Sequence, residues 1–189
     1  MAHHLRVIAG TAGGRRLSAP RGDAIRPTTG RVKAAVFSAL AARERLVGAK
    51  VLDLYAGTGA LAIEALSRSA ARAVLVENDR GALEALRRNL SVTGTATSAS
   101  AVNAGVDTFL AGTPAPDAPF DLVFCDPPYD VESPALDKVI APLGSREWTA
   151  ADALVVVERP VGAASPQVEG MQIAWERTFG DTLVFFLST

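Results

Sequence analysis

The sequence predicts an α/β fold, with a mostly parallel sheet covered by helices on both faces. Apolar runs of strand length alternate with helical patterns between about residue 50 and residue 158, which is typical of parallel sheets. A glycine-rich turn joins the first run to its helix. Two alternating segments near the C-terminus, 171–178 and 182–187, flank Gly180-Asp181 and predict a final antiparallel pair.

The chain begins with segments that lie outside this alternation. Residues 5–9 and 16–18 flank a Thr-Ala-Gly-Gly turn and predict a small hairpin, and residues 20–27 form a loop. Thr28 or Thr29 can cap a helix that reaches about residue 45 and carries apolar side chains at helical spacing. We therefore expect an N-terminal extension over 1–45 and a larger domain over 46–189.

The first strand of the larger domain, 50–54, leads into a turn with the sequence DLYAGTG, residues 53–59. Gly57 and Gly59 lack a Cβ atom, so a ligand can approach the backbone there. The helix over 59–68 adds free N–H groups behind them. A second strand, 73–77, ends in Glu77, where a carboxylate can accept hydrogen bonds from ribose hydroxyls.

The same turn allows two ligands. Gly57, Gly59 and Ala62 formally fit the dinucleotide pattern G-x-G-x-x-G/A, which indicates a nicotinamide cofactor. In that pattern, however, the first glycine follows the strand almost at once, whereas three residues separate Asp53 from Gly57. An acidic residue ahead of the glycines is typical of sites for S-adenosylmethionine (SAM), whose ammonium group Asp53 would face. The spacing therefore favours SAM over NAD.

The remaining strands are expected at 98–103, 120–125 and 153–158, and the helices at 80–93, 105–111 and 134–143. Asp126-Pro-Pro-Tyr129 directly follows the strand over 120–125. Two prolines cannot continue a sheet, so Asp126 lies at its carboxyl edge, where ligands bind in open α/β sheets. A carboxylate, the Pro127 carbonyl and the Tyr129 ring suit a planar base that carries an exocyclic amine.

Composition and charge narrow the class of protein. The chain has 189 residues, 49% of them apolar, one cysteine and no apolar stretch long enough to span a membrane, so we expect a cytoplasmic protein without a disulfide. His3 and His4 lack partners at ligand spacing, and we expect no metal. Residues 1–50 contain ten basic and two acidic side chains, whereas the rest contains nine and eighteen. This asymmetry predicts phosphate contacts near the N-terminus.

Several motifs together resemble the RsmD-type methyltransferases, which modify guanine N2 in small-subunit ribosomal RNA. The shared segments cover nearly the whole chain and are Arg6–Gly10, Gly14–Leu17, Arg26–Thr29, Arg31–Lys33, Phe37, Asp53–Gly59, Glu64–Arg68, Glu77, Asn89, Asp126–Tyr129 and Phe179–Thr182. The Arg-Pro-Thr segment and the Glu-Ala-Leu-Ser-Arg run are the most particular to this family. The resemblance implies a Rossmann-like SAM-dependent methyltransferase fold with a seven-stranded sheet and a C-terminal antiparallel strand.

The resemblance also implies an activity and a set of site residues. The protein would transfer a methyl group from SAM to the exocyclic N2 amine of a guanine in 16S ribosomal RNA, as a cytoplasmic monomer acting on the RNA or the assembling small subunit. Asp126, Pro127 and Tyr129 would be catalytic. The cofactor would be bound by Asp53, Tyr55, Gly57, Gly59, Glu77, Gly105, Val106 and Asp126. The RNA would be contacted by Arg6, Arg15, Arg16, Arg26, Arg31 and Lys33.

The sequence departs from the family pattern at three positions and leaves other functions open. Gly30 and Ala34 replace acidic residues, and Gly105 replaces a polar one that meets the adenine amine. A DNA adenine-N6 methyltransferase also uses an Asp-Pro-Pro-Tyr turn, although no segment here is long enough for the usual target-recognition region. A small-molecule or dinucleotide enzyme and a non-catalytic ribosome-assembly factor are further alternatives.

Overall fold

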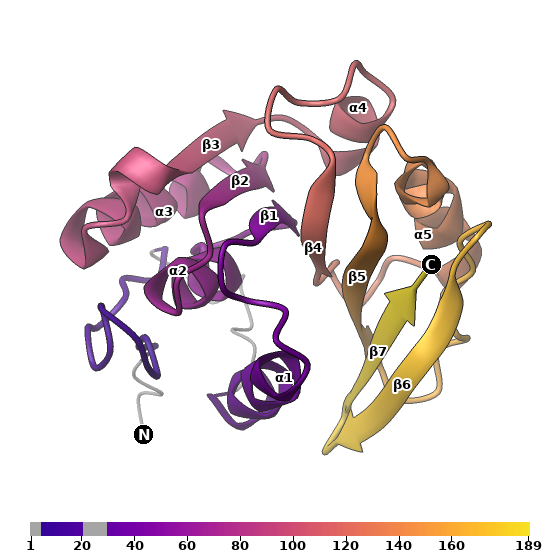
Figure 1. Cartoon of the computed structure of the whole chain (residues 1–189), viewed down its shortest axis with the longest axis horizontal. Coiled ribbons are helices and arrows are strands. Elements are labelled where there is room, and N and C mark those ends of the chain that lie inside the picture. Colours follow the sequence, from indigo (N-terminus) through magenta and orange to yellow (C-terminus); the bar gives the residue numbers. More distant parts are fainter. Residues whose placement is uncertain (1–4, 21–29) are drawn as a thin grey trace.

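The computed structural model describes residues 5–20 and 30–189, whose strands form one seven-stranded sheet in the order β3-β2-β1-β4-β5-β7-β6 (Figure 1). Neighbours among β1 to β5 are parallel, and β7 is antiparallel to both β5 and β6. This arrangement confirms the predicted fold class. The strands are β1 Lys50–Leu54, β2 Arg72–Glu77, β3 Ala99–Asn103, β4 Phe120–Cys125, β5 Thr149–Pro160, β6 Gln172–Phe179 and β7 Thr182–Ser188.

The helices follow the predicted order with small shifts at their ends. They are α1 Gly30–Ala42, α2 Ala60–Ser67, α3 Arg80–Thr93, α4 Val106–Leu110 and α5 Ser133–Ile140, with 3-10 turns at Ala96–Ser98 and Ala141–Gly144. The α3 helix has the predicted bounds because Asp79 caps its first turn and Gly94 ends it with a positive φ. The predicted helix over 134–143 changes to a 3-10 turn at Pro142, which has no N–H to donate.

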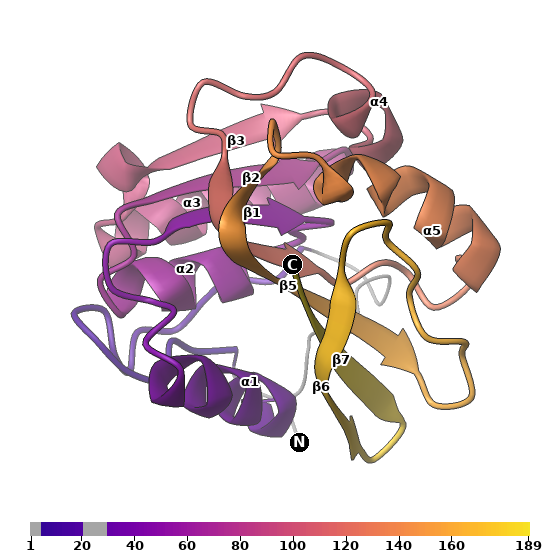
Figure 2. The same cartoon turned by 45° about the vertical axis from the view of Figure 1, so that its right-hand side comes forward.

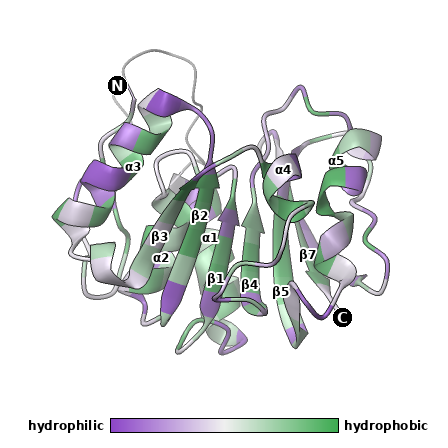
Figure 3. Cartoon of the chain, turned by 90° about the horizontal axis from the view of Figure 1, so that it is seen from above, coloured by the Kyte–Doolittle hydropathy of each residue, from purple (hydrophilic) through white to green (hydrophobic). Residues whose placement is uncertain are grey.

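Two apolar cores lie on the two faces of the sheet. One contains side chains from α1, α2 and α3, and the other contains side chains from α4 and α5. Figures 1 and 2 show the helices and the sheet between these cores. The central strands are coloured hydrophobic along most of their length, whereas hydrophilic residues recur along α3 (Figure 3). Strands β1, β2, β4 and β7 are therefore buried on both faces along most of their length, whereas the edge strand β6 is largely exposed. The carboxyl edge of the parallel strands is left for a ligand. Among the described helices, none has the length and apolarity required to cross a bilayer.

The N-terminal segment differs in detail from the predicted hairpin. Its only isolated bridge among the described residues joins Arg6 to Arg16, and Val7, Ala12 and Leu17 are buried in the same core as α1 and α2. Backbone hydrogen bonds from Val7 N to the Arg15 carbonyl and from Leu17 N to the Leu5 carbonyl flank this bridge, whereas Glu64 and Ser67 of α2 accept from other N–H groups of the segment. The predicted loop 20–27 lies outside the described residues after Pro20, as do the predicted helix start at Thr28 or Thr29 and Arg26.

Candidate active site at the carboxyl edge of the sheet

Three acidic residues point from the same face of neighbouring strands near their carboxyl ends. Asp53 in β1 pairs in register with Leu75 and Phe124, both of which belong to the core beneath α1 and α2. Glu77 ends β2 on that same face, two residues after Leu75. Asp126 follows β4, two residues after Phe124. The structure thus brings together carboxylates that are up to 73 positions apart in the sequence.

Asp53 is the most deeply buried of these carboxylates, with 1% of its surface exposed. Its Oδ2 accepts a hydrogen bond from the Ala62 N–H at 3.1 Å, so it holds the first turn of α2 against the end of β1. Burial raises the pKa of Asp53 well above its usual value, and the nearby Asp126 and Glu77 raise it further. A cationic group bound beside it would favour the ionised form.

The glycine-rich turn is shaped by backbone conformation and by packing. Gly57 has a φ of 54°, and an added Cβ there would have only the Tyr55 carbonyl within 4 Å, at 3.9 Å. Gly59 has a φ of 77°, but an added Cβ would lie 3.2 Å from a Leu75 methyl group and 3.3 Å from Ile63. Gly57 therefore leaves space for a ligand, whereas Gly59 is required by the packing of α2 on the sheet.

Glu77 organises the turn as well as facing it. Its Oε2 accepts from the Gly57 N–H at 2.8 Å, and its Oε1 accepts from the N–H groups of Asn78 and Asp79, each at 2.8 Å. Tyr55 precedes the glycines with a φ of 59° and packs against the opposite core. Burial raises the pKa of Tyr55 to about 12, so its hydroxyl stays protonated and available as a donor.

The predicted adenine-binding backbone lies at the start of α4. Gly105 is the residue before the helix and Val106, whose side chain is buried, is its first residue. Asp107 was not identified from the sequence, yet its Oδ1 lies within 2.6 Å of where a Gly105 Cβ would stand. The Asp107 carboxylate therefore lies beside Gly105, although the family pattern has its polar residue at position 105 itself, two positions earlier in the sequence.

The turn after β4 holds the predicted catalytic residues in different environments. Asp126 is partly exposed, Pro127 is buried, and 40% of the Tyr129 surface is exposed. The Tyr129 hydroxyl lies 3.0 Å from Thr182 Oγ1, at the start of β7, which fixes one edge of the ring. Tyr129 is therefore held at its hydroxyl while a substantial part of the residue stays exposed beside Asp126.

The end of β5 adds two charged residues that were not identified from the sequence. Glu158 and Arg159 are 4% and 2% exposed. Arg159 Nη2 donates to the Val131 carbonyl, which ties the turn after β4 to β5. Charged residues directly after the apolar run 153–157 carry the same signal that identified Asp53 and Asp126, so the sequence could have revealed them.

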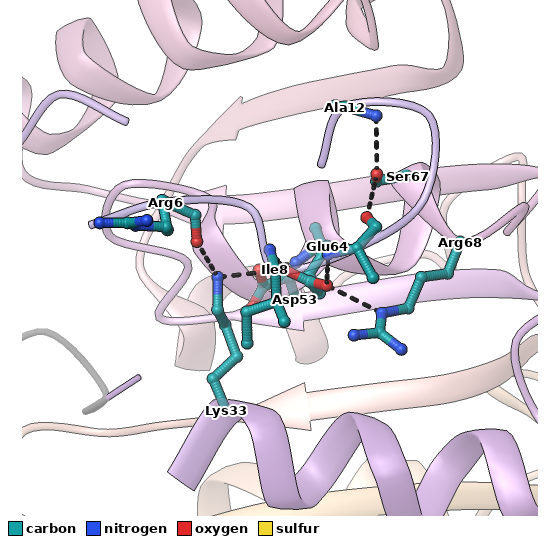
Figure 4. Close-up of polar contacts among 10 residues, drawn as sticks. Arg6, Ile8, Ala12, Lys33, Asp53, Glu64, Ser67 and Arg68 are labelled. Atoms are coloured by element: carbon teal, nitrogen blue, oxygen red, sulfur yellow. Dashed lines mark hydrogen bonds and ion pairs between the residues drawn. The ribbon is translucent and has the colours of Figure 1, made fainter. Parts of the chain in front are cut away.

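The Glu-Ala-Leu-Ser-Arg run, Glu64–Arg68, anchors the N-terminal segment to α2 (Figure 4). Glu64 is fully buried and accepts from Ile8 N at 2.6 Å and Ala9 N at 3.0 Å. Its oxygens also pair with Lys33 Nζ at 3.2 Å and Arg68 Nε at 2.8 Å. Four further hydrogen bonds join Ser67 to this segment, and Asn89 bonds both the N–H and the carbonyl of Ser18.

The basic residues assigned to RNA contact are not equivalent in the structure. Arg6, Arg15, Arg16 and Arg31 have exposed side chains, and Arg15 also donates to the Val92 carbonyl of α3. Lys33 is only 2% exposed and donates to the Arg6 carbonyl at 2.7 Å besides its pairing with Glu64. The expectation that Lys33 meets a phosphate is therefore at odds with its position, because its charge is already satisfied in the interior. Arg26 lies outside the described residues.

Comparison with known proteins places this arrangement in a family. The family described as "Conserved hypothetical protein 95" matches residues 5–188. The "Ribosomal RNA small subunit methyltransferase D" of Escherichia coli (strain K12) is 41% identical over 166 residues, which cover 87% of this chain and 79% of that protein. The solved structure of the "Putative methyltransferase yhhF from Escherichia coli" has a TM-score of 0.84 at 36% identity, and the match covers 98% of this chain and 97% of that one.

A more distant structure shows that the fold is shared more widely. An RNA methyltransferase from Salinibacter ruber, solved in complex with S-adenosyl-L-homocysteine, has a TM-score of 0.63 at 17% identity, covering 86% of this chain and 93% of that one. The predicted resemblance is confirmed by the match over nearly the full length and by the identity to the Escherichia coli relative. The chain belongs to the family described as "Conserved hypothetical protein 95", the RsmD-type family of SAM-dependent methyltransferases.

Proposed function

We propose that this protein transfers a methyl group from SAM to the exocyclic N2 amine of a guanine in small-subunit ribosomal RNA. The observation that carries the proposal is the position of Asp126, which is partly exposed at the carboxyl edge of β4 and is followed by a rigid Pro-Pro-Tyr turn. The family membership and the name of the Escherichia coli relative supply the substrate class.

The residues at the carboxyl edge fit SAM as the methyl donor, which supplies a methyl carbon bound to a positively charged sulfur. The open side of Gly57 admits a ligand to the backbone, and Glu77 is placed to accept from ribose hydroxyls. The Asp53 carboxylate suits the ammonium end, and the backbone at Gly105 and Val106, with Asp107 beside it, suits the adenine. SAM contains no pyrophosphate, so the site does not require a group that binds one.

Methyl transfer to an amine is an in-line displacement, so alignment supplies a large part of the rate. The amine of guanine is a weak nucleophile because its lone pair is delocalised into the ring. Asp126 and the Pro127 carbonyl accept from its two N–H groups, which turns the lone pair towards the methyl carbon, while Tyr129 stacks on the base. The nitrogen forms the new N–C bond as the S–C bond breaks, and it then loses one proton to Asp126.

The RNA contact is assigned to the N-terminal part of the chain. Residues 1–45 act as a basic extension and residues 46–189 as the methyltransferase domain, in a cytoplasmic monomer that acts on the RNA or the assembling small subunit. Arg6, Arg15, Arg16 and Arg31 have the exposure that phosphate contacts need. Contact of Arg26 with the RNA stays a prediction, because this residue lies outside the described residues. The buried Lys33 is not expected to contact the RNA.

Mass mapping of nucleosides from cells with and without the protein tests the reaction. We expect one N2-methylguanine of 16S ribosomal RNA to disappear with the protein and to return with the wild-type gene but not with Asp126→Ala. Purified Asp126→Ala should still bind SAM in calorimetry, and NAD should not bind. Loss of an N6-methyladenine from DNA, or binding of NAD without SAM, would contradict the proposal.

A further inference from the structure

Glu158 lies beside Asp126 at the end of the neighbouring strand. Cys125, the last residue of β4, pairs in register with Val157 of β5. Asp126 directly follows the first of these residues and Glu158 follows the second, so the two carboxylates are close enough for the charge of Asp126 to raise the pKa of Glu158. Both point to the same face as Phe124 and Val156, which belong to the core under α1 and α2. Neighbouring strands are about 4.8 Å apart, which places a second carboxylate within reach of any group bound at Asp126.

This second carboxylate has an unused acceptor. Glu158 is 4% exposed, and its Oε1 is buried without a hydrogen-bond partner among the described residues. A buried acceptor left unsatisfied costs about 1–3 kcal/mol, so it is rarely retained without a function. Burial raises the pKa of Glu158 well above its usual value, and the charges of Asp126 and Asp53 raise it further.

The two neighbouring carboxylates, Asp126 and Glu158, therefore suit a ligand that has two adjacent hydrogen-bond donors, one for each carboxylate. The Watson–Crick edge of guanine has this pattern, because its 2-amino group and N1–H are neighbours that both donate. Adenine carries a lone pair at N1, which repels the ionised carboxylate, the form of Glu158 that donation from N1–H stabilises. Donation to the ionised form of Glu158 would also offset the unfavourable burial of its charge.

We propose that Glu158 accepts a hydrogen bond from the N1–H of the target base, next to Asp126 on the 2-amino group, and so selects guanine. This inference rests on the proposed function and adds a residue that determines specificity. Glu158 has no part in forming or breaking the methyl bonds. Its effect is confined to which base edge is held with its amine at Asp126.

Base analogues that lack N1–H but keep the 2-amino group test the proposal. A synthetic RNA segment carries 2,6-diaminopurine or 2-aminopurine in place of the mapped target guanine. The segment is ligated into 16S RNA, and the RNA is assembled into small subunits. Both analogues carry a lone pair at N1, and they differ from each other only at position 6. We expect wild-type protein to methylate guanine at least about tenfold faster than either analogue in single-turnover assays. If the wild-type protein methylates guanine and both analogues at equal rates, the proposal is wrong, whatever the variants show.

The variant Glu158→Gln then identifies the residue responsible. A glutamine amide can accept from N1–H or, after rotation, donate to an N1 lone pair. We therefore expect discrimination between guanine and both analogues to fall to about twofold or less, while SAM affinity measured by calorimetry stays unchanged. The exposed Glu176→Gln in β6 is the matched control and should keep full discrimination.

The outcomes separate this inference from the proposed function. If Glu158→Gln retains the wild-type preference for guanine, Glu158 does not read N1–H, although the methyltransferase assignment stands. If the wild-type protein methylates no guanine N2 at all, both proposals fail together. If Glu158→Gln loses SAM binding, the wild-type comparison of the three bases still decides whether N1–H is read.

Discussion

Replacing Glu64 by Gln is expected to destabilise the protein and to loosen the N-terminal segment from α2. Glu64 is fully buried, and each of its oxygens accepts from one backbone N–H and pairs with one cationic side chain. Oε2 serves Ile8 N and Lys33 Nζ, and Oε1 serves Ala9 N and Arg68 Nε. The substitution keeps the shape of the side chain but turns one acceptor into an NH2 donor.

The expected loss of stability follows from the equivalent surroundings of the two Glu64 oxygens. Whichever way the amide is oriented, its NH2 group faces one backbone N–H and one cation, so no rotamer repairs the loss. In one orientation the opposed cation is Lys33, only 2% exposed, and its pKa is already lowered by burial. Removing one partner of a buried ion pair costs about 3–5 kcal/mol. Domains have a total stability of about 5–15 kcal/mol, so the loss is a large share of it.

Urea unfolding of Glu64→Gln, Lys33→Met and the double variant measures the effect. The double variant should cost less than the sum of the single ones, because it leaves neither charge buried alone. Hydrogen exchange should show faster exchange of the Ile8 and Ala9 amides in Glu64→Gln. The control is Glu84→Gln on α3, where the partially exposed carboxylate lies 3.5 Å from Arg80 and should contribute less than about 0.5 kcal/mol. A Glu64→Gln protein as stable as this control, with both amides still protected, would refute the reasoning.

Three further predictions concern RNA, the target base and pH. Replacing Arg15 and Arg16 by Ala should reduce the slope of log affinity for RNA against log salt concentration by about 0.7–0.9 for each phosphate that the variant no longer neutralises. SAM affinity measured by calorimetry should stay unchanged. An unaltered slope would show that these two residues do not bind the RNA. Tyr129→Phe loses the hydrogen bond to Thr182 at 3.0 Å and should slow single-turnover transfer by about twofold to tenfold, as should Thr182→Val, whereas Tyr129→Ala should lose about 1–3 kcal/mol more through stacking. Equal losses in all three variants would contradict a role for the ring. Because burial and the nearby Asp126 and Asp53 raise the pKa of Glu158, the folded protein without bound RNA holds a proton that the unfolded chain releases above about pH 4.3. The stability of the RNA-free protein therefore falls as pH rises from that point. Glu158→Gln has no such proton to hold, so in urea unfolding its stability relative to the wild type should increase as pH rises above about 4.3. Parallel curves of stability against pH for the two proteins would show that Glu158 does not hold the proton.

The sequence by itself determined the strand ends and therefore most of the chemistry. An apolar run that stops at an acidic residue can be identified without a structure, and Asp53, Glu77 and Asp126 were located in this way. The alternation of strands and helices then required a parallel sheet, which collects such ends at one edge. Local signals such as Asp79 before α3 and Gly94 after it set helix bounds for the same reason, because a cap acts within a few residues.

Tertiary structure alone decided the contacts between distant segments. Lys33 counts as one positive charge among ten in the first fifty residues, yet its ammonium pairs with Glu64, thirty-one positions later, and is removed from solvent. Gly59 belongs to a ligand-binding pattern, but its missing Cβ makes room for Leu75 and Ile63. Glu158 follows an apolar run in the sequence, but its proximity to Asp126 is decided by the register of β4 and β5. Burial and partnership depend on how the chain folds back on itself, and no local pattern contains that information.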